Sequence, residues 1–218
     1  FVADGASWGA WDMASYWEHG ETGRNPQDRF SVKLGMTTEP FSTPQRVYDP
    51  EAAWDTTPTG DGDYFAGYKT IKQGATDSAA AGTALATGRK TLSGRISVDP
   101  DGEPLPTISE AMKAAGRSVG VVSSVTFNHA TPAVFGAKNE RRGDYKTIAS
   151  DMINGDTLDL IMGGGNPNFD AEGQPKAEPE YDRISEADWN AVNAPDGPMT
   201  LIETKAEFEA LADGSLEV

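Results

Sequence analysis

Hydrophobic residues along most of the chain fall either at helical spacing or in short continuous runs, with turns rich in Gly, Pro and Asp between them. Apolar residues three or four positions apart indicate one buried face of a helix, and short apolar runs bounded by turns indicate buried strands. The pattern predicts helices over residues 11–19, 107–116, 144–154 and 204–212, strands over 118–125 and 158–162, and the end of a buried strand at residues 1–3.

The order of these elements predicts the fold class. A helix followed by a strand occurs twice between residues 107 and 162, which favours parallel pairing of the two strands. We therefore expect an α/β protein with a mostly parallel sheet, formed as a single domain over residues 1–218. Residues 40–64 and 166–198 lack this spacing, so we expect two long surface loops, and such loops often border a binding site.

The most informative stretch is the one in which Asp77 and Ser78 precede an Ala-rich segment that stops at Gly88. A helix N-terminus offers unpaired N–H groups and a partial positive charge, which favour an alkoxide or a phosphate beside it. Ser78 is therefore a candidate nucleophile. A second interpretation stays open, because Asp and Ser are also common residues for capping a helix.

Other polar residues follow the predicted strands, at the edge where ligands gather in parallel α/β sheets. His129 and Thr131 come just after the strand over 118–125, and Asp4 follows residues 1–3, where a carboxylate suits a hard divalent cation.

Arg141 and Arg142 are adjacent in an acidic chain. One guanidinium could clamp a phosphate with two hydrogen bonds, and an ordinary surface salt bridge is the alternative.

Composition narrows the classes of function. The chain has 34 acidic and 18 basic residues, so its formal charge is −16, and it has no Cys. This charge argues against binding to nucleic acid or membranes by bulk attraction, and it fits either solubility or adaptation to high salt. The lack of Cys excludes a disulfide scaffold and a Cys nucleophile.

No apolar run approaches the roughly 20 residues of a spanning helix. No signal peptide precedes the first strand, and we therefore expect that the true start of the chain is missing.

Taken together, these residues resemble the N-terminal half of a bacterial alkaline phosphatase. The resemblance extends from Phe1 to about Phe169. Its motifs stand in the family's order and rough spacing: Asp4-Gly5, Thr76-Asp77-Ser78-Ala79-Ala80-Ala81-Gly82-Thr83-Ala84, Gly88-Arg89-Lys90-Thr91 with a strand over residues 94–99, His129-Ala130-Thr131-Pro132-Ala133 with a later Arg, and Leu160-Ile161-Met162-Gly163-Gly164-Gly165. It implies a three-layer α/β/α sandwich and hydrolysis of small phosphate monoesters.

The resemblance also implies roles for single residues. Ser78 would attack the phosphorus to form a phosphoserine intermediate, and Arg142 would hold the other phosphate oxygens, unless a register slip gives that role to Arg141. Zn²⁺ and Mg²⁺ would be the cofactors. Asp4 would bridge the two ions with Ser78 beside them, Thr131 would ligate the magnesium, and His129 would stand next to it. Asp77 receives no direct chemical part.

Two departures from the family pattern matter. The family's Asp-Gly-Met-Gly reads Asp4-Gly5-Ala6-Ser7 here, and the family's zinc site uses His, Asp and Glu residues from the C-terminal half, whereas this chain has only His19 and His129. We therefore expect an incomplete chain, whose remaining zinc ligands lie outside these residues. The resemblance further implies a homodimer in the periplasm or outside the cell.

Other functions stay open beside the phosphatase. A metal-dependent phosphodiesterase or sulfatase would resemble the same fold, although a Ser followed by Ala-Ala-Ala-Gly-Thr favours the phosphatase. A non-catalytic acidic binding protein, whose helix cap resembles the motif by chance, is the alternative from another class.

Overall fold

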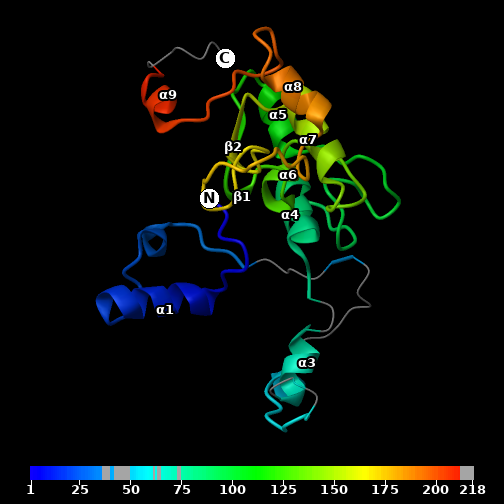
Figure 1. The fold of residues 1–218 in the computed structure, drawn as a ribbon. Coiled ribbons are helices and arrows are strands. Elements are labelled where there is room, and N and C mark those ends of the chain that lie inside the picture. Colours follow the sequence, from blue (N-terminus) through cyan, green and yellow to red (C-terminus); the bar gives the residue numbers. More distant parts are fainter. Residues whose placement is uncertain (36–39, 42–49, 61, 63–64, 73–74, 212–218) are drawn as a thin grey trace. The chain divides into compact units, whose positions relative to one another are not determined.

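The structure is a computed structural model in which residues 1–35, 40–41, 50–60, 62, 65–72 and 75–211 are described. Contacts divide the chain into two compact units, residues 1–38 and 39–218 (Figure 1). The single domain expected from the sequence stays a prediction.

The first unit is built on helix α1 (Trp8–His19) and a 3-10 turn, η1 (Pro26–Arg29). Ser15 is fully buried, and its hydroxyl donates to the carbonyl of Glu21 at 2.8 Å. The side-chain amide of Asn25 donates to the carbonyl of Trp11 at 3.1 Å. These bonds hold residues 20–29 against α1. The strand expected at residues 1–3 is wrong, because no described residue pairs with these residues in a ladder.

The second unit carries the remaining elements, which among the described residues are eight helices and two strands. In chain order they are α2 (Pro50–Ala53), α3 (Ala66–Lys72), α4 (Ser78–Thr87), α5 (Ile108–Ala114), β1 (Gly120–Thr126), α6 (Ala130–Ala133), α7 (Tyr145–Asn154), β2 (Leu160–Gly164), α8 (Glu186–Val192) and α9 (Lys205–Glu209). Residues 94–99 form isolated bridges at Ile96 and Val98 rather than the expected strand.

The two strands confirm the α/β class and the parallel pairing. β1 and β2 run parallel, with Val121 opposite Ile161 and Val122 opposite Met162. The register shifts after Val122, so that Thr126 pairs with Gly164. α6 and α7 lie between the strands in the sequence and form the crossover. Both strands therefore end at the same edge of the sheet, just before His129 and just after Met162.

The two expected loops contain described helices. α2 lies within residues 40–64, where residues 42–49, 61 and 63–64 fall outside the described part, and α8 lies within 166–198. Ser185 caps α8 by accepting from the amide of Asp188 at 3.0 Å. None of the described helices combines the length and the apolar composition that a membrane span requires.

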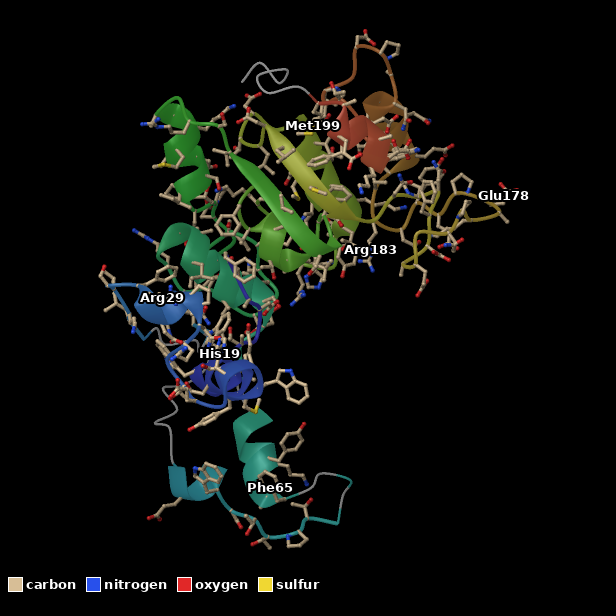
Figure 2. The ribbon with its side chains drawn as sticks, turned by 90° about the vertical axis from the view of Figure 1, so that its left-hand side faces the viewer. His19, Arg29, Phe65, Glu178, Arg183 and Met199 are labelled. Carbon is tan, nitrogen blue, oxygen red and sulfur yellow. The ribbon has the colours of Figure 1, made fainter. Side chains whose placement is uncertain are left out.

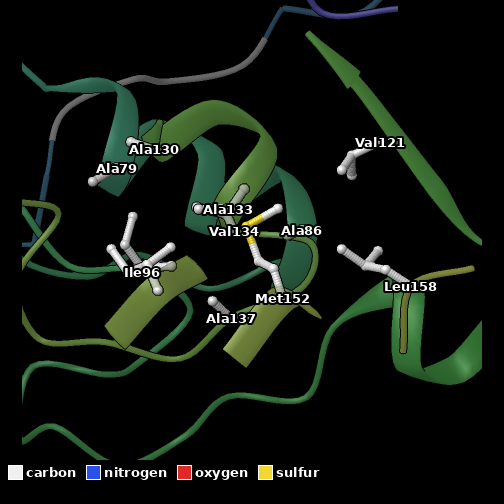
Figure 3. Packing of buried hydrophobic residues seen from close by; sticks show 11 residues of the cluster. Ala79, Ala86, Ile96, Val121, Ala130, Ala133, Val134, Ala137, Met152 and Leu158 are labelled. Atoms are coloured by element: carbon white, nitrogen blue, oxygen red, sulfur yellow. The ribbon is translucent and has the colours of Figure 1, made fainter. Parts of the chain in front are cut away.

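A core of small and branched side chains surrounds α4. Ala79 and Ala86 of α4 pack with Ala130, Ala133 and Val134 around α6 (Figure 3). Gly82 permits this close approach, because a Cβ there would lie 3.0 Å from a methyl group of Val134. α4 ends at Gly88, whose φ of +72° suits glycine. α4 is thus packed against α6, the helix that His129 precedes.

A buried hydroxyl network fastens α4 on another side. The Thr83 hydroxyl donates to the carbonyl of Arg95 at 3.0 Å and accepts from the amide of Ser97 at 2.9 Å. The Ser97 hydroxyl donates in turn to the carbonyl of Val134 at 2.6 Å. Thr83 and Ser97 are both fully buried, so their polar atoms depend on one another.

Thr83→Val should lower the free energy of unfolding by about 2 kcal/mol, because it keeps the volume and leaves a buried amide and a buried carbonyl without their partner. Urea unfolding followed by circular dichroism measures the change. Thr147→Val on the exposed face of α7 is the matched control and should shift stability by less than about 0.5 kcal/mol. Equal stability of the two variants would show that the Thr83 network contributes nothing.

Candidate active site

The N-terminus of α4 presents the candidate nucleophile. Ser78 is the first residue of this ten-residue helix and is partly buried. Asp77 is the N-cap, and its Oδ1 accepts from the amide of Ala80 at 3.0 Å. Of the two residues that could cap the helix, Asp77 therefore does so. Ser78 lies where the helix dipole favours negative charge.

Asp77 has a second function that the sequence did not indicate. Its Oδ2 accepts from the amide of Gly94 at 2.9 Å and from Nη1 of Arg142 at 3.1 Å. The Arg142 amide also donates to the carbonyl of Gly94 at 2.7 Å. One carboxylate thus joins the start of α4, the turn at Gly94 and the guanidinium of Arg142.

The pKa of Asp77 lies below its ordinary value. Partial burial acts to raise the pKa of this carboxyl, but the amide hydrogen bonds from Ala80 and Gly94 together with the Arg142 guanidinium outweigh that effect. Asp77 is consequently a carboxylate at neutral pH, and it holds Arg142 by charge as well as by geometry.

His129 completes the cluster from the other side. Nη2 of Arg142 lies 3.1 Å from Nε2 of His129. A guanidinium can only donate, so Nε2 accepts and the ring proton is on Nδ1. His129 is the N-cap of α6, directly behind β1, and Arg142 lies before α7. The structure therefore brings Asp77, Arg142 and His129 together at the edge where the strands end.

The other predicted residues are placed differently. Arg141 is exposed, and its amide donates to Oδ1 of Asn139 at 2.8 Å. Thr131 is the second residue of α6 and is partly buried. Asp4 belongs to the first unit and lies in a turn before α1. His19, at the end of α1, lies 3.7 Å from a carboxylate oxygen of Glu18.

The described residues do not fit a zinc site. Zinc normally takes three or four protein donors with His nitrogen or Cys sulfur among them. No group of three or more His, Asp or Glu residues in the described part of the chain could hold a metal ion. Thr131 offers one oxygen of the kind that magnesium prefers, whereas His129 offers only ring nitrogens, and its Nε2 already accepts from Arg142.

Acid should weaken the contact between Asp77 and Arg142. The pKa of Asp77 is lower in the folded than in the unfolded state, so its stabilisation is fully present above the unfolded value of about 3.9 and is lost as the pH falls through the folded value. Asp77→Asn can still cap α4 but carries no charge. We expect it to be about 1 kcal/mol less stable at pH 7, with the difference vanishing toward pH 2.

Urea midpoints of both proteins between pH 2 and pH 7 measure this convergence. A difference that stays constant across this range would contradict the ionised contact.

Three comparisons place the chain among known proteins. A family model described as alkaline phosphatase matches residues 52–194. The chain is 41% identical over 123 residues to alkaline phosphatase 3 of Bacillus subtilis (strain 168), covering 52% of this chain and 27% of that protein. The match therefore spans about a quarter of the length of that relative.

Solved structures give the same family name. The cold-active alkaline phosphatase from Shewanella sp. is 49% identical, with a TM-score of 0.41, over 44% of this chain and 24% of that one. A variant of the alkaline phosphatase from the Antarctic bacterium TAB5, described with Mg bound in its M3 site, is 37% identical, with a TM-score of 0.38, over 39% of this chain and 25% of that one.

Proposed function

Because the chain belongs to the alkaline phosphatase family, we propose that the protein at its natural full length hydrolyses phosphate monoesters, with Ser78 as the nucleophile. The observation that carries this proposal is the linked group of Asp77, Arg142 and His129 beside the start of α4. A guanidinium held by the N-cap residue that precedes Ser78, at the start of a helix, is an arrangement suited to a phosphate dianion.

The side chains divide the chemistry between them. The Ser78 oxygen attacks phosphorus, the ester oxygen leaves with its electron pair and takes up a proton, and a phosphoserine remains. Water then attacks that phosphorus, which releases inorganic phosphate and restores the hydroxyl. The N-terminus of α4 stabilises negative charge on Ser78 and on the phosphoryl oxygens in both steps.

Arg142 binds the phosphoryl oxygens that do not react. A guanidinium has five N–H groups, and the two that go to Asp77 and His129 leave three for phosphate. Asp77 and His129 fix the plane of the guanidinium before substrate arrives. This fixed orientation lowers the entropy lost on binding, which is the benefit of a preorganised site.

Zinc and magnesium remain proposed cofactors, as Lewis acids that would activate the attacking groups. Among the described residues, no group of three or more His, Asp or Glu side chains could hold such an ion. Metal analysis of a polypeptide of residues 1–218 beside the full-length protein tests this. We expect tight zinc in the longer protein alone, and stoichiometric tight zinc in the shorter one would contradict the donor count.

The decisive experiment for the function is a substrate comparison. Full-length protein should hydrolyse a chromogenic phosphate monoester much faster than the matching diester or sulfate ester. Preference for the diester or sulfate would favour a related hydrolase, and no turnover of any of them would favour an acidic binding protein.

Family membership also supports a homodimer and a periplasmic or secreted location as proposals. Light scattering coupled to size exclusion measures the first, and fractionation of the source cells measures the second. A monomer at micromolar concentration, or activity confined to the cytoplasm, would contradict the respective proposal.

A further inference from the structure

Asn128 is a fully buried polar residue between the end of β1 and His129. Its Nδ2 donates to the carbonyl of Tyr145 at 2.7 Å and to the carbonyl of Arg183 at 2.6 Å. Carbonyl oxygens only accept, so the amide must face them with its nitrogen. Both hydrogens of this amide are therefore used to hold two segments that are distant in the sequence.

The two residues that accept from Asn128 also contact each other. The guanidinium carbon of Arg183 lies 3.9 Å from the centre of the Tyr145 ring, which is a cation–π contact. Figure 2 shows Arg183 beside the carboxyl ends of the strands. A Cβ on Gly165, just after β2, would lie 3.5 Å from Arg183 Cβ. We call Asn128, Tyr145 and Arg183 the Asn128 clamp.

The clamp acts on both partners of the bond between His129 and Arg142. Asn128 is joined by one peptide bond to His129, whose Nε2 contacts Arg142. Tyr145 begins α7, three residues after Arg142. Fixing Asn128 to Tyr145 therefore sets the spacing between the segment that carries the imidazole and the segment that carries the guanidinium.

We propose that Asn128 is a positioning residue for phosphate binding, acting through His129 and Arg142. This inference rests on the proposed function. In this role Asn128 does not contact the substrate. Its hydrogen bonds keep the guanidinium of Arg142 in the orientation that binds phosphate. A shift of about 1 Å in such a group is enough to change rates or affinities by up to about a hundredfold.

Two variants of the full-length protein test the clamp. Asn128→Ala removes both hydrogen bonds, and Asn128→Asp keeps the volume but turns a carboxylate toward two carbonyl oxygens. Both should raise KM for a phosphate monoester and Ki for inorganic phosphate by about ten- to a hundredfold, with a smaller change in kcat. Asn193→Ala is the matched control, because the Asn193 amide donates at 2.8 Å only within α8, and it should leave both constants unchanged.

A double variant separates positioning from simple support of the fold. If Asn128 acts through Arg142, then Asn128→Ala should add little to the KM and Ki of Arg142→Ala. Arg183→Met keeps the carbonyl partner and removes the guanidinium from Tyr145, so it should shift the same constants in the same direction by less. This milder variant keeps the test available if Asn128→Ala does not fold.

The outcomes are distinct. Folded Asn128 variants with lower thermal stability but wild-type KM and Ki, or effects fully additive with Arg142→Ala, would overturn the clamp. A wild-type protein that hydrolyses no phosphate monoester would refute the proposed function instead. In that case the dissociation constant for inorganic phosphate still decides the clamp, which predicts weaker binding in both Asn128 variants.

Discussion

Ser78→Ala should lower turnover of a phosphate monoester by several orders of magnitude, because the variant has no oxygen to form the phosphoserine. The helix should keep its cap, since Asp77 rather than Ser78 caps α4 and alanine is well suited to the first position of a helix. Steady-state kinetics of the full-length protein measure the loss. Acid trapping of a ³²P-labelled enzyme should succeed with wild type and fail with Ser78→Ala.

Ser124→Ala is the matched control, because Ser124 is an exposed serine of β1. It should retain both turnover and the labelled intermediate. Near-normal turnover by Ser78→Ala would show that another group attacks the phosphorus.

Arg142→Ala should raise KM and Ki for inorganic phosphate about thirtyfold and lower kcat less, because Arg142 binds the phosphoryl group both before and during reaction. The figure corresponds to about 2 kcal/mol, the size of a charged hydrogen bond. Arg142→Lys should recover only part of the loss, since an ammonium lacks the planar fork with which a guanidinium pairs with two phosphate oxygens. Product inhibition and initial rates give all three constants.

Arg141→Ala is the matched control. Arg141 is exposed, and the backbone amide that donates to the carbonyl of Gly94 is that of Arg142 and not that of Arg141. Kinetics of this variant should match wild type. The reverse pattern, a silent Arg142→Ala beside a defective Arg141→Ala, would transfer the phosphate role to Arg141.

Local sequence signals predicted α4, α5, α7, β1, β2 and α9 of the second unit, but they missed α8, and the strand expected over residues 94–99 is not formed. The helix predicted over 107–116 begins after Thr107, whose hydroxyl accepts from the amide of Glu110 while the Glu110 carboxylate accepts from the amide of Thr107. Helix and strand follow each other twice, and the two strands are parallel as predicted. These features depend on residues close together in the chain, so a pattern can show them.

The candidate site depends on contacts that no local pattern contains. Asp77 and Arg142 are 65 positions apart, and Asn128 and Arg183 are 55 positions apart. In the sequence, helix capping alone accounts for an Asp at position 77. No sequence pattern therefore indicated that the Asp77 carboxylate also contacts Arg142. Arg141 and Arg142 are identical in type and adjacent, and only the path of the backbone decides which one faces Asp77.

The small side chains of α4 limit how this protein can diverge. Ala79, Ala80 and Ala86 are buried, and Gly82 already lies against Val134, so larger side chains at these positions would overlap their neighbours. Natural variants of this helix should therefore exchange mainly Gly, Ala, Ser and Thr. New substrate preferences would have to arise in segments such as residues 166–185, where the described chain has neither helix nor regular strand and insertions are better tolerated.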